Sequence, residues 1–396
     1  MPSAHPPDRD GRAAPPLRTL MPRRRGPTQR RFRPPGRNVA ISLFPFRHYC
    51  GNREEGWRPS LGRSACREGS GVSRKMSEKR GPRACILGAA GFIGRHVVAE
   101  CLARDWLVTA VDIVEGLSAG LQSNNRLTFR QGRLTDEDFV RDAVAGADAV
   151  VCLAPSSLPA RSNDDLAGEI DSHVRVTVRI AELAHAAGVR NFVFASSGGT
   201  VYGIDSPHPI SEDAPTRPRN AYGVSKLAIE HYLRILRDLR GMRTISLRIS
   251  NPYGAGQNAG SGQGFIAMAM RRAFAGEPLV IWGDGSTVRD FLYVRDLARA
   301  VVAACDYLGD ASVINIGSGL GYSLREVAEK VERVSGRKLT LRYEPKRAID
   351  VAKNVLDISL AFQELGWRPT TPLDDGLRRT AEWWAARQIA AVPGQA

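Results

Sequence analysis

One stretch of this sequence, Arg83 to Val98, constrains the fold more than any other. An apolar run of strand length, Ala84–Leu87, is followed at once by three glycines spaced three residues apart: Gly88, Gly91 and Gly94. Apolar residues then recur at helical spacing. A strand, a glycine-rich turn and a helix N-terminus in this order form an anion cradle, because free backbone N–H groups and the helix dipole point at the bound group. The stretch predicts a dinucleotide pyrophosphate site, the alternative being a tight turn that binds nothing.

A carboxylate at the end of the next apolar run indicates which dinucleotide is bound. The run Leu107–Val111 ends in Asp112, which lies 24 positions after Gly88. A carboxylate at this place suits the adenosine ribose hydroxyls and repels a 2′-phosphate. The sequence therefore predicts NAD rather than NADP as the cofactor.

The strong positive charge of the chain is concentrated in its first part. Residues 1–75 hold 17 Lys and Arg against five Asp and Glu, so only +3 of the net charge of +15 falls on residues 76–396. This first part is rich in Pro, Gly and Arg and shows no apolar period, which is typical of a disordered segment. We expect residues 1–76 to be a disordered basic tail. Three interpretations remain: an arm that contacts nucleic acid, a transit peptide, or a segment absent from a mature protein that begins at Met76.

The cysteines and the apolar runs indicate the cellular compartment in which the chain is expected. Six cysteines show no paired metal-ligand spacing, so no metal site is predicted. Cys85 and Cys152 lie inside apolar runs, where cysteine is usually a small buried hydrophobe. No run of 18 apolar residues occurs, so no membrane span is expected. We expect a cytoplasmic protein.

Alternating strand and helix patterns predict the fold class. From Arg83 onward, short apolar runs alternate with helical periodicity, which is typical of an α/β protein with a doubly wound parallel sheet of the Rossmann type. Long helices are expected at 170–187 and 221–240. We expect a dinucleotide-binding domain over 83–250 and a smaller substrate-binding region over 251–390, some of whose strands and helices return to the main domain.

A tyrosine and a lysine four residues apart are the first candidates for chemistry. Tyr222 and Lys226 open the helix expected at 221–240, and side chains at i and i+4 share one helix face. An exposed helical pair is the alternative interpretation, but the pair follows the fifth expected strand of a dinucleotide fold. A lysine cation beside a phenol stabilises the phenolate, which can then take a proton from a sugar or alcohol hydroxyl.

Hydroxyl groups follow the strand expected at 191–195. Ser197 and Thr200 lie just after it, where the carboxyl ends of parallel strands border the ligand crevice. Either hydroxyl is a candidate to stabilise developing charge on the substrate, and the sequence does not decide between them. The alternative is a Ser/Gly loop without a role in catalysis.

These motifs together resemble the extended short-chain dehydrogenase/reductase family, of the nucleotide-sugar epimerase type exemplified by UDP-glucose 4-epimerase. The resemblance covers roughly residues 83–385. It implies that Tyr222 and Lys226 are the catalytic pair and that the strand end at Leu153 and Ala154 lines the cofactor. The cofactor-binding residues it implies are Gly88, Gly91, Phe92, Ile93, Gly94, Asp112, Leu134, Leu153, Ala154, Tyr222 and Lys226.

The resemblance also implies a site for a nucleotide-diphosphate sugar. Asn251, in an Arg-x-x-Asn-x-x-Gly run, and Arg289 match residues that contact the diphosphate, while Arg347 and Asp350 match the last substrate pair. Two guanidinium groups suit a diphosphate because each can grip it through two hydrogen bonds. Asn354 matches a position that borders the 2-substituent of the sugar and is small enough to admit an N-acetyl group.

The chain departs from the family pattern at three places. Arg133, between Gly132 and Leu134, stands where an adenine-facing carboxylate is usual, and His173 stands where an Asn is usual. Gly198 lies four residues before Tyr202, where a catalytic Ser or Thr is usual. The hydroxyl must then come from Ser197, Thr200 or a water molecule.

The expected function is NAD-dependent epimerisation at C4 of a nucleotide sugar, UDP-glucose/UDP-galactose or the N-acetyl analogues, through a transient 4-keto sugar. The loop before Tyr202 lacks the acidic pair that a dehydratase needs, which argues against that neighbouring activity. Another sugar-nucleotide oxidoreductase and a non-catalytic NAD-binding protein remain alternatives. The resemblance implies a homodimer, and nucleic acid is expected as a partner only through the basic tail.

Overall fold

The computed structural model describes residues 81–391 except 118–120, 122, 155–161, 204–205, 262–263 and 347–350. The tail expected over residues 1–76 lies outside the described residues. So do Arg347 and Asp350, the predicted last substrate pair.

A parallel sheet of seven strands carries the glycine-rich stretch. In spatial order its strands are β10 (Val313–Ile316), β6 (Arg243–Ile249), β5 (Asn191–Ser197), β4 (Ala149–Cys152), β1 (Arg83–Leu87), β2 (Leu107–Asp112) and β3 (Leu127–Gln131). The chain winds outward from β1 in one direction to β3 and then in the other to β10. The strand order thus reverses beside β1, and in such sheets ligands bind at this switch point, outside the carboxyl ends of the strands.

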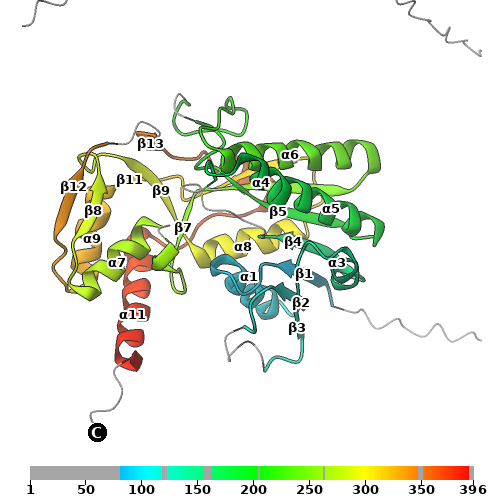
Figure 1. The fold of residues 1–396 in the computed structure, drawn as a ribbon, viewed down its shortest axis with the longest axis horizontal. Coiled ribbons are helices and arrows are strands. Elements are labelled where there is room, and N and C mark those ends of the chain that lie inside the picture. The colour runs from blue at the N-terminus through cyan, green and yellow to red at the C-terminus, as the bar shows by residue number, and fades with distance from the viewer. Residues whose placement is uncertain are drawn as a thin grey trace, which may run out of the picture. The chain divides into compact units, whose positions relative to one another are not determined.

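Helices lie on both faces of this sheet (Figure 1). They are α1 (Phe92–Ala103), α3 (Glu137–Val144), α4 (Leu166–Glu169), a π-helical segment (Ile170–Arg175), α5 (Val176–Ala186), α6 (Ala221–Arg240), α8 (Val294–Cys305) and α10 (Ser359–Leu365). Alternate residues of a strand point to opposite faces, so Ala84 and Ile86 pack with α1 and α8, while Cys85 and Leu87 pack with α3, α5 and α6. The fold class predicted from the sequence is confirmed.

The second half of the chain adds smaller sheets and three further helices. The strands are β7 (Asn251–Tyr253), β8 (Leu279–Trp282), β9 (Val288–Tyr293), β11 (Gly321–Ser323), β12 (Leu341–Glu344) and β13 (Lys353–Asn354). The helices are α7 (Phe265–Ala275), α9 (Leu324–Ser335) and α11 (Leu373–Ala391), with a short 3-10 turn at Ala259–Ser261. β9 pairs with β7, β11 and β13, and β8 pairs with β12. These elements share a core of their own.

Most predicted elements are found close to their expected bounds, and the helix expected at 170–187 differs most. Helical structure begins earlier, at Leu166, because the side chain of Asp165 accepts a hydrogen bond from the backbone N–H of Gly168 and so caps it. Among the described residues, none of the helices combines the length and apolar character needed to cross a bilayer.

Candidate active site

A cleft of about 460 Å³ opens at the carboxyl ends of β1, β5 and β6. Five separate parts of the chain line it: the glycine-rich loop with the start of α1, Leu153 after β4, the end of β5 with the loop that follows, the start of α6, and the segment that follows β6. The predicted residues among its lining are Gly88, Gly91, Phe92, Ile93, Gly94, Leu153, Ser197, Thr200, Tyr222, Lys226 and Asn251. Residues predicted for cofactor, catalysis and substrate therefore meet in one cavity.

The glycine-rich loop is packed so tightly that side chains do not fit. A Cβ atom on Gly94 would lie 2.1 Å from the carbonyl oxygen of Gly88. Gly88 itself has a φ of 88°, which favours glycine, and a Cβ there would lie 2.9 Å from the Cβ of Ala154. Gly91 is the N-cap of α1 and offers no side-chain cap. The first turn of α1 therefore presents its backbone N–H groups and positive dipole end to the cleft.

Asp112 lies beside this loop, at the end of β2. One carboxylate oxygen accepts a hydrogen bond from the backbone N–H of Ala90 at 2.9 Å, and the other accepts from Ile113 at 2.8 Å and Val114 at 3.2 Å. The carboxylate borders a second cavity of about 270 Å³, which Gly88, Leu134 and Ala154 also line. Because Gly88 borders both cavities, the predicted adenosine end of the site adjoins the cleft.

Tyr222 and Lys226 reach the cleft from the first turns of α6. The helix starts here because the Asn220 side chain accepts a hydrogen bond from the N–H of Gly223 at 2.8 Å. Lys226 is 5% exposed, and its Nζ donates to the carbonyl oxygen of Ala195 at 2.8 Å. The same Nζ lies 5.4 Å from the centroid of the Tyr222 ring. The ammonium group is thus held beside the phenol by a backbone carbonyl of β5.

The loop after β5 brings two hydroxyl groups to the cleft and turns Gly198 away from it. Ser197 and Thr200 line the cavity, and the hydroxyl of Thr200 is buried without a hydrogen-bond partner. A Cβ on Gly198 would lie 2.6 Å from a methyl group of Leu356 and 3.0 Å from the carbonyl oxygen of Arg248. A side chain at position 198 would therefore collide with packed neighbours, whereas Ser197 and Thr200 belong to the residues that line the cleft.

The predicted substrate residues lie on the side formed by the second half of the chain. Asn251 and Arg289 line a cavity of about 190 Å³ that shares Asn251, Pro252 and Gly264 with the main cleft. Arg289 donates through Nη1 to the carbonyl oxygens of Val288 at 2.9 Å and of Val351 at 2.7 Å. The aromatic residues Tyr253, Phe265 and Phe291 also belong to the lining of this 190 Å³ cavity.

Sequence reasoning missed two polar residues of the cleft, Ser250 and Gln257. The hydroxyl of Ser250 and the amide oxygen of Gln257 are buried without a hydrogen-bond partner in the described structure. Ser250 follows β6 directly, so its place at a strand end was a signal for it. Gln257 lies in a loop that His96 of α1 contacts through the carbonyl oxygen of Ala255 at 2.9 Å, and no local pattern marks such a contact.

The remaining departures from the family pattern lie near the cofactor side. Arg133 lines the cavity beside Asp112. His173 is buried in the π-helical segment, where its Nδ1 lies 2.9 Å from the Ser172 hydroxyl and 3.4 Å from a carboxylate oxygen of Glu169. Asn354, the residue expected to border the 2-substituent of the sugar, belongs to the substrate side instead. It is 2% exposed, and its side-chain amide donates to the carbonyl oxygen of Gly198 at 3.1 Å.

Comparison with known proteins supports the same interpretation. A family model described as the NAD dependent epimerase/dehydratase family matches residues 84–317. The chain belongs to this family.

Individual members of this family are similar to this chain over about three quarters of its length. A dTDP-4-dehydro-6-deoxyglucose reductase of Escherichia coli is 32% identical over 74% of this chain and 94% of its own length. A UDP-glucose 4-epimerase of Mycolicibacterium smegmatis is 33% identical over 76% of this chain and 98% of its own. A crystal structure of UDP-glucose 4-epimerase from Thermotoga maritima with UDP-glucose superposes with a TM-score of 0.73, at 30% identity, covering 77% of this chain and 99% of that one.

The family assignment confirms NAD, the predicted cofactor, and the structure fits it. The glycine loop of this epimerase/dehydratase family member leaves no room for side chains, as a close approach of a pyrophosphate to the backbone requires. The carboxylate of Asp112 lies where it can accept hydrogen bonds from ribose hydroxyls. The lining therefore fits a dinucleotide that extends from the Asp112 cavity into the main cleft.

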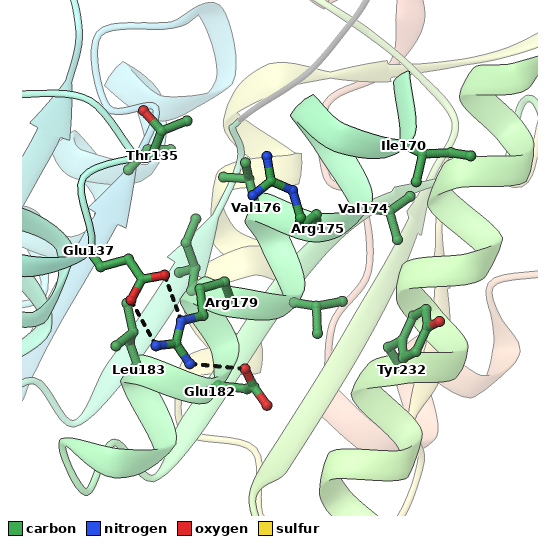
Figure 2. A pocket seen from close by; sticks show the side chains of 13 residues that line it. Thr135, Glu137, Ile170, Val174, Arg175, Val176, Arg179, Glu182, Leu183 and Tyr232 are labelled. Carbon is green, nitrogen blue, oxygen red and sulfur yellow. Dashed lines mark hydrogen bonds and ion pairs between the residues drawn. The ribbon is translucent and has the colours of Figure 1, made fainter. Parts of the chain in front are cut away.

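A further cavity of this family member, of about 620 Å³, lies between α3, α5 and α6 (Figure 2). Arg179 of α5 donates to both carboxylate oxygens of Glu137, at 2.9 and 2.7 Å, and also to Glu182 at 3.3 Å. Tyr232 of α6 and Ile170 border the same hollow. This cavity shares no lining residue with the main cleft, but it shares Leu134, Thr135 and Val176 with the cavity beside Asp112, so it adjoins the predicted adenosine end of the site.

Proposed function

We propose that this chain is a nucleotide-sugar 4-epimerase, which oxidises the sugar at C4 and reduces it again from the opposite face. One observation carries the proposal: the phenol, the ammonium group and two hydroxyls line the same cleft as the dinucleotide loop. NAD, when bound there, supplies the reversible oxidation at C4 and is regenerated in each cycle.

In this proposal, the residues of the cleft move one proton and stabilise charge. Tyr222 takes the proton from the 4-hydroxyl of the sugar and later returns it. Lys226, held at the carbonyl of Ala195, stabilises the phenolate and contacts the nicotinamide ribose. Ser197 or Thr200 donates a hydrogen bond to the sugar oxygen on which negative charge develops. The hydroxyl of Thr200 is buried without a hydrogen-bond partner, so in this role it would have to turn toward the cleft.

The proposed substrate is a UDP-sugar. The cavity that joins the cleft at Asn251 combines Arg289 with three aromatic residues, a lining that suits a phosphate next to a nucleobase. The Thermotoga maritima relative was crystallised with UDP-glucose. Arg347 and Asp350 remain the proposed partners of the far end of the nucleotide. UDP-glucose and UDP-galactose, or their N-acetyl analogues, are the candidate pairs.

A second candidate function is net reduction of a nucleotide-linked keto sugar. The similarity to the Escherichia coli dTDP-4-dehydro-6-deoxyglucose reductase favours it, because the name of that protein describes the reduction of a nucleotide-linked keto sugar. A reductase consumes reduced cofactor in proportion to product, whereas an epimerase leaves the cofactor pool unchanged.

We further propose a homodimer formed through α5 and α6. Three large apolar side chains on the outer side of α6 are exposed: Tyr232 at 48%, Ile235 at 46% and Leu239 at 79%. Tyr232 also lines the cavity of Figure 2. Exposed apolar surface of this kind marks association surfaces, and a second copy of the chain buries it symmetrically.

The experiment offers a panel of UDP-sugars to the purified full chain without added cofactor and identifies products by NMR. We expect interconversion of one 4-epimer pair. Tyr222→Phe should slow turnover by about 10²–10⁴-fold, because the general base is lost, and should leave the bound NAD content unchanged. Near-normal turnover by this variant would remove Tyr222 from the mechanism. A parallel assay with a nucleotide-linked 4-keto sugar and added reduced cofactor tests the reductase: consumption of reduced cofactor in proportion to product, with no interconversion of UDP-sugars, would establish it.

A further inference from the structure

A buried carboxylate on α6, Glu230, has no part in the chemistry proposed above. It is 5% exposed and lies four residues after Lys226 and eight after Tyr222. Residues at this spacing share one face of a helix. The face of α6 that presents the phenol and the ammonium group to the cleft therefore continues inward to Glu230.

Glu230 joins α6 to two neighbouring strands of the sheet. Arg248 of β6, itself 5% exposed, donates through Nε to both carboxylate oxygens at 3.2 Å and through Nη2 to Oε2 at 2.8 Å. The hydroxyl of Ser196, near the end of β5, donates to Oε1 of the same carboxylate. One buried group thus holds three elements together.

Consecutive residues of β5 are held by consecutive turns of α6. Lys226 binds the carbonyl oxygen of Ala195, and Glu230 accepts the hydroxyl of Ser196. These two contacts fix the position of α6 along its own axis relative to the end of β5. Ser197 is the next residue of the strand, and Tyr222 is one turn earlier on the helix. The contacts therefore set the position of the proposed base relative to the proposed hydroxyl donor.

The far end of the same loop is tied to the same ion pair. Arg248 donates through Nη1 to the hydroxyl oxygen of Tyr202 at 2.9 Å, and the Tyr202 hydroxyl donates to the side-chain oxygen of Asn315 at 2.6 Å. Tyr202 is 1% exposed, and burial raises its pKa to about 12, so it stays a neutral donor. Loop 197–202, which carries both candidate hydroxyls, is anchored at each end on Glu230 and Arg248.

We propose that Glu230, acting through Arg248 and Ser196, is a positioning residue: it holds loop 197–202 in register with the helix that carries Tyr222. The proposal rests on the function proposed above. A buried ion pair adds little net stability over well-packed apolar side chains. We therefore assign to the pair of Glu230 and Arg248 the anchoring of loop 197–202 rather than a contribution to the stability of the fold.

The test is Glu230→Gln, which keeps the shape of the side chain and removes its charge. The amide can accept through one oxygen only, so Arg248 and Ser196 compete for it. We expect kcat to fall by about ten- to a hundredfold, because a misplacement of the order of 1 Å has this effect, with KM and bound NAD unchanged. Amide hydrogen exchange should speed up in residues 197–202, a readout that does not depend on turnover.

Two further variants separate positioning from loss of stability. Ser196→Ala leaves the ion pair intact but removes the hydrogen bond from Ser196 to Glu230. Because Glu230→Gln weakens the same contact, the loss of kcat in the double variant should be smaller than the product of the two single losses. Asp296→Asn is the matched control: Asp296 is 2% exposed, is paired with Arg299 at 2.8 Å and does not line the cleft. It should lower Tm and leave kcat per bound NAD unchanged.

The outcomes are distinguishable from failure of the proposed function. If the wild-type chain interconverts no sugar, the function proposed above is wrong, and hydrogen exchange in residues 197–202 alone decides the positioning role. If Glu230→Gln lowers Tm but leaves kcat and this exchange at wild-type values, the positioning role is wrong. Equal losses of kcat in Glu230→Gln and Asp296→Asn would also overturn it.

Discussion

Gly198 illustrates what spacing along the chain reveals about a single residue and what it does not. Its place four residues before Tyr202 led to the prediction that the catalytic hydroxyl comes from Ser197, Thr200 or a water molecule. In the structure, a side chain there would point at Leu356 and at the carbonyl oxygen of Arg248, while Ser197 and Thr200 belong to the residues that line the cleft. The spacing along the chain identified the loop, but the direction of each side chain depends on backbone turns that the spacing does not reveal.

Introducing a hydroxyl at position 198 should therefore not raise activity. Gly198→Ser places Cβ 2.6 Å from a methyl group of Leu356, and overpacking of this kind costs about 1–3 kcal/mol. We expect a lower Tm and no gain in kcat, measured by thermal unfolding and by turnover. Gly199→Ala is the matched control, because the nearest atom to a Cβ there is the Ser197 hydroxyl at 4.0 Å. A gain in kcat at unchanged Tm in Gly198→Ser would contradict this account.

At the scale of elements, strands and helices with a clear apolar period were predicted well. α6 begins and ends where its sequence indicates, between the cap at Asn220 and Gly241 in the left-handed conformation. The early start of helical structure at Leu166 and the π-helical segment that follows it were not predicted, because a polar cap and an extra residue per turn leave no apolar period.

The outer face of α6 provides a prediction about assembly. Ile235 is 46% exposed there, and an ionised glutamate in a buried apolar interface is unfavourable. Ile235→Glu should shift the chain from dimer to monomer in light scattering coupled to size-exclusion chromatography. Tyr343→Glu, at a residue that is 47% exposed on β12, should leave the dimer unchanged. A wild-type chain that is monomeric throughout the measured concentrations would rule out the dimer.

At the scale of the whole molecule, the cleft depends on the convergence of five segments that are far apart in sequence. The residues alone predicted the glycine loop at Gly88 and the start of α6, because each carries a spaced motif. The sequence also predicted Asn251 and Arg289 through resemblance. It did not predict Ser250, Gln257 or the linkage of Glu230 to Arg248, since these residues acquire their roles only when distant strands and loops pack together.

The central claim is that the cleft oxidises a sugar at C4 and reduces it again without net use of cofactor. The measurement that tests it most directly is conversion of UDP-galactose by the full chain in deuterated water, with no added cofactor, followed by NMR and by the absorbance of reduced nicotinamide. The account predicts that UDP-glucose accumulates, that its C4 position keeps protium, and that no net reduced cofactor appears. Deuterium at C4, or product formed only in proportion to cofactor consumed, would contradict it.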